Sequence, residues 1–218
     1  MRKALIILLT FLLVLMTGCS SSKEEASAAE EKQPAEQKEE KTEVKILVVY
    51  FSRTGEQYTV GVIDKGNTAI VAEMIAEKTG ADLFEILPAD DHYPMTYAEL
   101  TDVAKQEQND DARPEYAGTV PDLSQYDTVF IGAPVWWGDW PMIMYTFFEE
   151  NASVLAEKTL VPFSTHEGSG LSGFDRKLAA AISGAEIAEG LAVRGNDAQN
   201  KQDPVREKVN SWIEGLGY

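Results

Sequence analysis

The stretch ILVVYFSRTG, residues 46–55, joins two kinds of sequence that together indicate the fold. Its first six residues are β-branched, leucine or aromatic without a break, which is typical of a strand buried on both faces of a parallel sheet. Hydroxyl and glycine residues follow at once, and apolar side chains then recur at helical spacing over Thr68–Lys78, before Gly80. The stretch therefore predicts a strand, a loop and a helix, which is the repeating unit of an α/β domain.

Further strands and helices alternate along the rest of the chain. The predicted strands cover 82–87, 128–133, 159–163 and 186–193, and the predicted helices cover 97–108, 141–150, 171–182 and 204–214, with 112–122 as a loop. This alternation predicts one doubly wound α/β domain over residues 44–218, with a five-stranded parallel sheet and helices on both faces. Ligands of such domains bind beyond the carboxyl ends of the strands, so the loops after the first, third and fourth strands are the candidate sites.

The first residues of the chain have the form of a bacterial signal peptide. Residues 1–19 begin with two basic side chains, continue with the apolar run Ala4–Met16 and end at Cys19. The segment LMTGC resembles the lipobox of bacterial lipoproteins, with Met16 where leucine is preferred. The resemblance implies lipidation of Cys19 and attachment to the cell membrane on its extracytoplasmic side. An ordinary secretory signal with an incidental cysteine is the alternative.

The composition of the chain limits the kinds of ligand and partner that the protein is expected to bind. Residues 20–43 contain no aromatic side chain and are rich in Ser, Glu, Lys, Ala and Gln, which predicts a disordered acidic tether. The net charge is −17, and residues 45–218 alone have 28 acidic and 13 basic side chains. This excess of acid argues against a nucleic-acid ligand and against any membrane contact other than the lipid anchor. One cysteine and two distant histidines leave no disulfide and no metal site to expect.

The loop after the first strand has the composition of a phosphate site. Glycine and hydroxyl residues between a strand and a helix present free backbone N–H groups to an anion, which the helix dipole also favours. The candidates lie on either side of a ten-residue insertion, Glu56–Lys65: Ser52, Arg53, Thr54 and Gly55 before it, and Gly66, Asn67 and Thr68 after it. Neither a Walker loop nor a Gly-x-Gly-x-x-Gly fingerprint is present. A Ser/Thr-rich turn without a ligand is the alternative.

The loop after the third strand contains three tryptophans within five residues, at 136, 137 and 140. Large aromatic side chains at the mouth of a sheet face solvent, and exposed apolar patches usually mark a binding site. Flat rings suit a flat aromatic ligand, although at least one tryptophan is expected to pack on the sheet. The candidates are Ala133, Pro134, Val135, Trp136, Trp137 and Gly138. The alternative is that all three tryptophans are scaffold.

The loop after the fourth strand, STHEGSG at 164–170, consists of small and polar residues that let the backbone approach a ligand closely. A hydrolase with Ser164 or Ser169 as nucleophile and His166 as base is disfavoured, because the Gly-x-Ser-x-Gly elbow is absent. An ordinary loop histidine is the other interpretation of His166. The candidate ligand-binding residues are Thr165, His166, Gly168, Ser169 and Gly170.

The three loops together resemble those of the flavodoxins. The first is similar to their phosphate loop, Ser/Thr-x-Thr-Gly-Asn-Thr, divided by the insertion. The second is similar to the loop that flanks the flavin, and the third to their Thr-His-x-Gly-Ser-Gly stretch. The resemblance covers residues 44–218 and implies FMN as cofactor and a flavodoxin-like sheet order of 2-1-3-4-5. The last strand lacks the insertion of long-chain members, so the domain resembles the short-chain ones. Tyr93, Tyr97 and the insertion are further candidates for covering the pocket.

The resemblance is compatible with more than one function. An electron-transfer protein with an unidentified redox partner is preferred, because an acidic surface and aromatic walls disfavour extra negative charge on a reduced flavin and lower its potential. An NAD(P)H-dependent, FMN-containing reductase of quinones or metal ions shares the same fold and is the alternative. A tethered module that only captures flavin is a third class. No side chain is predicted to be catalytic.

Overall fold

The predicted first strand forms β1 (Ile46–Phe51), whose six residues are all buried inside a seven-stranded sheet. The computed structural model describes residues 44–218, and the signal peptide and tether predicted for residues 1–43 lie outside this range. The sheet order is β5-β4-β1-β6-β7-β8, and β9 also pairs with β7. The other strands are β4 (Asp82–Pro88), β5 (Tyr116–Ala117), β6 (Thr128–Pro134), β7 (Thr159–His166), β8 (Glu186–Ile187) and β9 (Leu191–Arg194).

The parallel part of the sheet has the predicted order, and the sheet differs from the prediction in two ways. β4, β1, β6 and β7 pair in parallel, and β8 and β9 both pair in parallel with β7 as two pieces of the predicted fifth strand. The interruption lies beside Pro162 of β7, which has no N–H to donate, and a Cβ on the neighbouring Gly190 would lie 2.8 Å from the Pro162 carbonyl oxygen. The second difference is β5, an antiparallel edge strand within the segment predicted as a loop.

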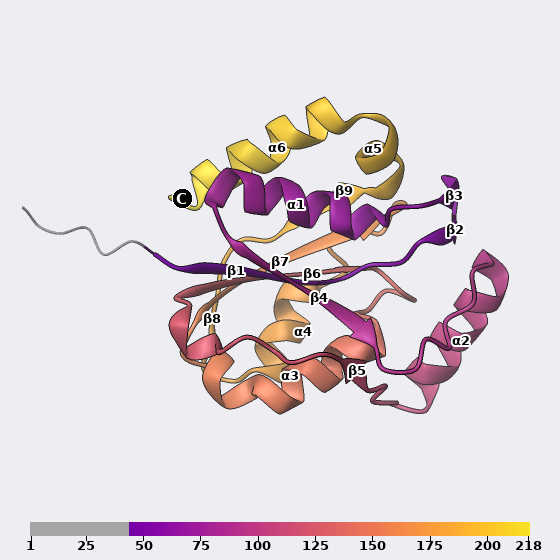
Figure 1. Cartoon of the computed structure of the whole chain (residues 1–218), viewed down its shortest axis with the longest axis horizontal. Coiled ribbons are helices and arrows are strands. Elements are labelled where there is room, and N and C mark those ends of the chain that lie inside the picture. Colours follow the sequence, from indigo (N-terminus) through magenta and orange to yellow (C-terminus); the bar gives the residue numbers. More distant parts are fainter. Residues whose placement is uncertain (1–43) are drawn as a thin grey trace, which may run out of the picture. The chain divides into compact units, whose positions relative to one another are not determined.

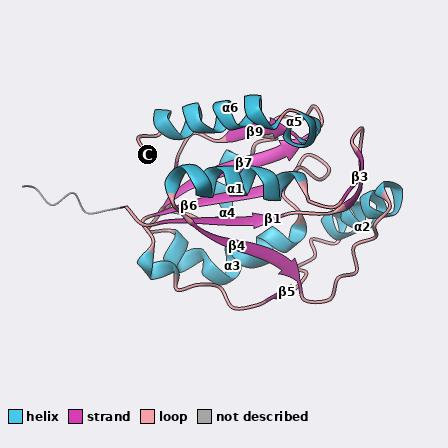
Figure 2. Cartoon of the chain, turned by 45° about the horizontal axis from the view of Figure 1, so that its top comes forward, coloured by secondary structure: helices cyan, strands magenta, loops and turns pink. Residues whose placement is uncertain are grey.

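Helices cover both faces of the sheet, as Figures 1 and 2 show. α1 and α6 lie on one face, α3 and α4 lie on the other, and α2 lies beyond one end of the strands (Figure 1). None of the helices in residues 44–218 is long and apolar enough to cross a membrane. Their bounds are α1 (Asn67–Thr79), α2 (Tyr97–Asn109), α3 (Met142–Leu155), α4 (Phe174–Ala181), α5 (Gly195–Asn200) and α6 (Gln202–Gly215), with a 3₁₀ turn at Leu123–Gln125.

All five predicted helices are present, but some of their ends differ and α5 was not predicted. α3 continues to Leu155, past the predicted end at residue 150. α4 begins at Phe174 rather than at residue 171, because Gly173 before it has a positive φ of 71° that no helix accommodates. α5 has the sequence GNDAQN, which is too short and too polar to show helical periodicity.

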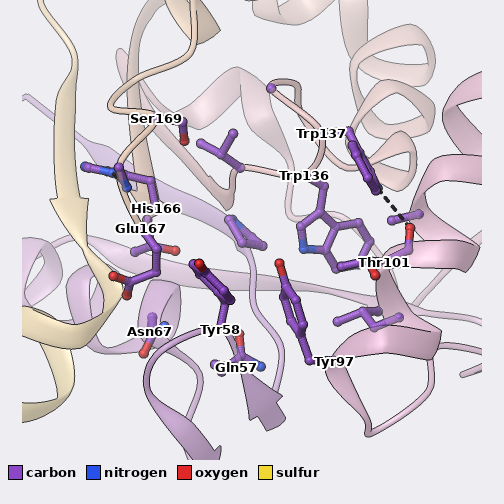
Figure 3. A pocket seen from close by; sticks show the side chains of 17 residues that line it. Gln57, Tyr58, Asn67, Tyr97, Thr101, Trp136, Trp137, His166, Glu167 and Ser169 are labelled. Atoms are coloured by element: carbon purple, nitrogen blue, oxygen red, sulfur yellow. Dashed lines mark hydrogen bonds between the residues drawn. The ribbon is translucent and has the colours of Figure 1, made fainter.

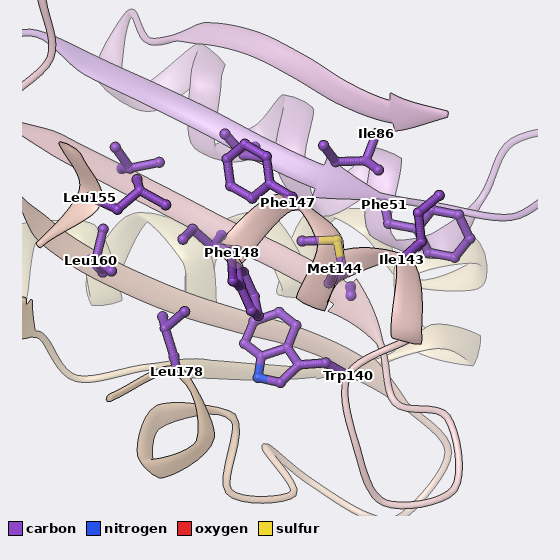
Figure 4. Close-up of a cluster of buried hydrophobic side chains, with 14 of the residues drawn as sticks. Phe51, Ile86, Trp140, Ile143, Met144, Phe147, Phe148, Leu155, Leu160 and Leu178 are labelled. Carbon is purple, nitrogen blue, oxygen red and sulfur yellow. The ribbon is translucent and has the colours of Figure 1, made fainter. Parts of the chain in front are cut away.

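The alternation of side chains along β1 divides the core into two clusters. Its odd-numbered residues join the cluster beneath α3, which includes Trp140 and Phe147 (Figure 4). Its even-numbered residues join the cluster beneath α1 and α6, which includes Val71 and Val209. Both faces of β1 are therefore covered by apolar side chains, and this is why its sequence lacks polar alternation.

The insertion Glu56–Lys65 forms a β-hairpin rather than an irregular loop. β2 (Gly55–Gln57) and β3 (Gly61–Ile63) pair antiparallel as a separate two-stranded sheet. Neither of the two core clusters contains a residue of the insertion. The hairpin is therefore an addition to the domain and lies near α2, as Figure 1 shows.

Candidate functional site

A cleft of about 530 Å³ opens at the carboxyl end of the sheet. Its walls come from the inserted hairpin, the start of α1, α2, and the loops after β6 and β7 (Figure 3). Its size falls within the roughly 300–1,000 Å³ typical of small-molecule sites. The lining residues are Gln57, Tyr58, Asn67, Tyr97, Leu100, Thr101, Ala104, Pro134, Val135, Trp136, Trp137, Gly138, Thr165, His166, Glu167, Gly168 and Ser169.

All three predicted loops contribute to this cleft, though to different degrees. The predicted site residues that line it are Asn67, Pro134, Val135, Trp136, Trp137, Gly138, Thr165, His166, Gly168 and Ser169. The predicted site residues that do not line it are Ser52, Arg53, Thr54, Gly55, Gly66, Thr68, Ala133 and Gly170. The second and third loops therefore form most of the wall, and the first loop reaches the cleft through the start of α1.

The hairpin leaves the two halves of the first loop side by side. A Cβ on Gly66 would meet the Ser52 hydroxyl and would lie 2.7 Å from the Arg53 carbonyl oxygen, so the close approach requires glycine. The Ser52 hydroxyl accepts a hydrogen bond of 3.0 Å from the N–H of Ala69, in the first turn of α1. The insertion is thus an excursion with its ends together, and the turn from β1 into α1 is preserved around it.

The first residue of α1 faces the cleft. Asn67, which begins the helix, lines the cleft, and its side-chain oxygen accepts a hydrogen bond of 2.9 Å from Gln199. The hydroxyls of Thr68 and Thr165 are 2.7 Å apart and connect the first loop to the third. N–H groups in the first turn of a helix have no partner within the helix, and the helix dipole favours an anion there. This end of the cleft is therefore suited to a phosphate group.

The side chain of Arg53 is directed away from the cleft. Its buried guanidinium donates to Asp91 Oδ1 at 2.9 Å and to the Tyr93 carbonyl oxygen at 2.6 Å, in the loop before α2. A buried charge requires such partners. The predicted basic neighbour of a phosphate is thus occupied by the protein's own loop, and no Lys or Arg of the described chain lines the cleft.

The three tryptophans of the second loop have three different environments. Trp140 is buried and stacks on Phe174, with ring centroids 3.6 Å apart, so it belongs to the core. Trp136 is half-buried and lines the cleft. Trp137 has a positive φ of 49° and is 54% exposed, and its Nε1 donates to the Thr101 carbonyl oxygen at 2.8 Å (Figure 3). Two tryptophans therefore line the cleft, and the third packs in the interior.

The third loop offers polar groups to the cleft. The N–H of Gly168 donates to His166 Nδ1 at 2.9 Å, which places the proton of a neutral imidazole on Nε2. Burial lowers the pKa of His166, as do the charges of Lys208 and Arg194, against the opposing charge of Glu167. The Ser164 hydroxyl instead donates to the Gly170 carbonyl oxygen at 3.0 Å, which does not suit a nucleophile. In residues 44–218 no cluster of metal-ligating side chains occurs.

Several lining residues lie outside the three loops that the sequence singled out. Tyr58 of the hairpin and Tyr97 of α2 stack with ring centroids 5.5 Å apart, side by side in Figure 3. Glu56 joins their elements, because its carboxylate accepts from the Tyr97 N–H at 2.9 Å. The further additions to the predicted site are Gln57, Leu100, Thr101, Ala104 and Glu167. Of the three candidates for covering the pocket, Tyr97 and the insertion contribute to its lining, whereas Tyr93 is buried and does not line it.

Known proteins resemble this chain along nearly all of its described part. A family model described as flavodoxin matches residues 45–216. Candidate flavoproteins from Bacteroides eggerthii and Bacteroides uniformis are each 29% identical, with TM-scores of 0.62 and 0.61. They cover 80% and 78% of this chain, and 98% of their own chains. A flavoprotein from Lactobacillus acidophilus, solved in complex with FMN, is 21% identical with a TM-score of 0.56 and covers 73% of this chain and 97% of its own. Among curated proteins none matches.

Proposed function

Because the chain belongs to the flavodoxin family, we propose that it binds FMN and acts as an electron carrier attached to the outer face of the cell membrane. The observation that carries this proposal is the cleft at the carboxyl end of the sheet. A helix N-terminus suited to phosphate lies at one side of it, and aromatic side chains suited to a flat ring lie at the other (Figure 3).

The residues present fit FMN in size and in chemistry. The cleft has the volume of a small-molecule site, and its lining combines flat aromatic rings with hydroxyl and backbone polar groups. Gly138 and Gly168 both have positive φ and leave open space where a Cβ would be, so the backbone there is open to a ligand. The Lactobacillus neighbour, which has the same fold, was solved with FMN. These points support flavin as the ligand.

Each part of the cleft is assigned a role in binding. The N–H groups at the start of α1, with the side chain of Asn67, hold the phosphate. The rings of Trp136 and Tyr97 flank the flavin ring and exclude water from it. The backbone of 165–170 and the Nε2–H of His166 provide hydrogen bonds to the polar edge of the ring. Bound FMN supplies one- and two-electron redox chemistry that no side chain provides.

Charge favours a carrier over a nicotinamide-dependent reductase. Nicotinamide dinucleotides carry several negative charges, and the residues lining the cleft include Glu167 but no Lys or Arg. The surrounding domain has a large acidic excess. An anionic hydride donor therefore finds no Lys or Arg in the lining to pair with its several charges, whereas a basic protein partner is attracted to the acidic domain and its encounter is accelerated. The same negative surroundings oppose additional charge on a reduced ring and lower the potential of the flavin.

The proposal is tested with an absorbance spectrum of the purified protein without its signal peptide, residues 20–218, recorded without oxygen before and after NADPH is added. We expect the visible bands of oxidised flavin, unchanged by NADPH and bleached by dithionite. A colourless protein that also fails to bind added FMN would contradict FMN binding. Bleaching by NADPH alone would instead identify a reductase, the alternative function.

A further inference from the structure

A buried polar chain lies behind the Trp136 wall of the cleft, and no part of the proposed function uses it. The Tyr93 hydroxyl donates to Glu107 Oε2 at 3.1 Å, and His92 Nε2 lies 2.7 Å from Glu107 Oε1. Tyr93 is 3% exposed and Glu107 is 8% exposed. A carboxylate buried to this degree persists only when it is hydrogen-bonded, and these two side chains provide its bonds.

Tyr93 connects this chain to the cleft. Its ring packs edge-on against Trp136, with centroids 5.2 Å apart, and against Phe51, with centroids 5.8 Å apart. Phe51 in turn packs edge-on against Trp136 at 5.4 Å. The ring of Trp136 that faces the cleft is therefore supported from behind by two aromatic rings, and only Tyr93 of the two has a polar group that fixes its position.

The hydrogen bonds of His92 determine its charge. Nδ1 lies 2.8 Å from the carbonyl oxygen of Asp90, and Nε2 lies 2.7 Å from the carboxylate of Glu107. Both partners accept, so both ring nitrogens must donate, and only the protonated imidazolium has two N–H groups. The pKa of His92 is raised accordingly: burial lowers it, but the hydrogen bonds and negative charges of Glu107 and Asp90 raise it by more. Its side chain is 42% exposed, so solvent protons reach it.

Arg53 fastens the same loop from the opposite side. It pairs with Asp91 and donates to the Tyr93 carbonyl oxygen, and its guanidinium lies 5.4 Å from the centroid of the Tyr93 ring. A guanidinium stays protonated in proteins, so this attachment persists when pH changes. The attachment through His92 is the one that the loss of a proton can break.

We propose that His92, Glu107 and Tyr93 are positioning residues of the cleft, which hold Trp136 in place while His92 is protonated. Protonated His92 makes both of its hydrogen bonds below the ordinary His pKa of about 6.5. As pH rises through its higher pKa in the folded protein, one of the two bonds is lost. The support of Trp136 then loosens, and the affinity of the cleft for a flat ring falls. The identity of that ring as FMN rests on the proposed function, whereas the support of Trp136 does not.

The first experiment needs no flavin. Near-ultraviolet circular dichroism of residues 20–218, recorded from pH 5.5 to 8.5, reports the environment of the tryptophans. We expect a change with its midpoint above pH 6.5 in the natural sequence, and its absence from His92→Gln and from Trp136→Phe. The variant His166→Gln, which removes the only other histidine, should retain the change. The same pH profile in His92→Gln and in the natural sequence would overturn the proposal.

The second experiment measures FMN dissociation constants over the same pH range from the quenching of flavin fluorescence. From pH 6 to pH 8 we expect the affinity of the natural sequence to weaken by roughly threefold or more relative to that of His92→Gln, the equivalent of one hydrogen bond, because titration of the FMN phosphate and of His166 affects both proteins alike. Tyr93→Phe keeps the ring without the hydroxyl and should bind at pH 6 about as weakly as the natural sequence at pH 8. Equal affinity of Tyr93→Phe and the natural sequence at pH 6 would contradict the role of the hydroxyl. If no protein binds FMN, the proposed function fails, while the dichroism still decides the role of His92.

Discussion

Residues of the same type in and around this cleft have different roles, which depend on their surroundings. The three neighbouring tryptophans illustrate this, since Trp140 packs in the core while Trp136 and Trp137 line the cleft. Two glycines of the first loop differ in the same way. Gly55 has a positive φ of 85°, whereas Gly66 has an ordinary backbone conformation and is required only because its neighbours are close.

Replacing Gly66 by Ala should destabilise the protein by about 1–3 kcal/mol, as overpacking in a close-packed region usually does. The added methyl would press on the Ser52 hydroxyl and on the Arg53 carbonyl oxygen, and the second of these is backbone that moves only with the loop. Urea denaturation measures the change in the free energy of unfolding. We also expect weaker FMN binding, because the start of α1 is displaced.

Gly215→Ala is the matched control for Gly66→Ala. Gly215 ends α6 and no atom lies within 4 Å of the position of an added Cβ, so the free energy of unfolding should change by no more than about 1 kcal/mol. A Gly66→Ala protein as stable as the natural sequence would show that the two halves of the first loop are not closely apposed.

At the scale of elements, the inserted hairpin links two helices on either side of the cleft. The Glu56 N–H donates to the Met95 carbonyl oxygen at 2.8 Å, just before α2. At the other end of the insertion, the side chain of Gln199 in α5 donates to the Lys65 carbonyl oxygen at 2.7 Å. The hairpin is therefore attached at both ends, and it supplies Tyr58 to the cleft without contributing to the core.

Removing residues 56–65 should leave a folded domain that binds FMN roughly tenfold more weakly. The fold survives because the core clusters contain no residue of the insertion, and the ends of the insertion lie together. Binding weakens because Tyr58 is lost and Tyr97 loses the ring on which it stacks, a change of about 1–3 kcal/mol per stacked ring. Thermal unfolding and flavin fluorescence titration measure the two effects.

Val62→Ala serves as the control within the hairpin. Val62 is 79% exposed and does not line the cleft, so FMN affinity should be unchanged. Loss of cooperative unfolding in the shortened chain would instead mean that the hairpin is part of the folding unit and not an addition to it.

At the scale of the whole molecule, the chain enters the domain at the end of the sheet opposite to the cleft. Val44 precedes the amino end of β1, whereas the cleft lies at the carboxyl end of the sheet (Figure 1). The domain is therefore entered at the end of β1 opposite to the cleft. The family is established over residues 45–216, while the signal peptide, the tether and the lipid on Cys19 remain predictions from the sequence.

Cys19→Ser should move the protein from the membrane fraction to the soluble fraction of cells that produce it. The substitution removes the thiol that the lipobox resemblance assigns to lipid attachment, and one lipid-bearing residue is the only predicted contact with the membrane. Immunoblots of both fractions measure the distribution. Ser22→Ala, in the predicted tether, should leave the protein with the membranes. Equal membrane association of Cys19→Ser and the natural sequence would contradict lipid anchoring at Cys19.

Local sequence was sufficient for the main strands and helices of this protein. Apolar runs of strand length, helical spacing and terminating glycines depend on neighbours within a few residues, and they predicted a parallel sheet and the loops that meet at the cleft, whereas the order of the strands was implied by the flavodoxin resemblance. Those loops also carry the resemblance to the flavodoxins, and the family match over residues 45–216 confirms the family. The interruption between β8 and β9 was not visible, because it depends on Pro162 in a neighbouring strand.

Tertiary structure alone decided which side chains line the cleft and which pack behind that lining. The Arg53 guanidinium reaches a loop 38 to 40 residues away, Tyr58 meets Tyr97 across two elements, and Glu107 joins His92 to Tyr93. No periodicity records such contacts, because each one depends on where the folded chain brings distant segments together. Sequence therefore predicted which loops meet at the cleft, and tertiary packing determined which residues line the cleft and which hold that lining in place.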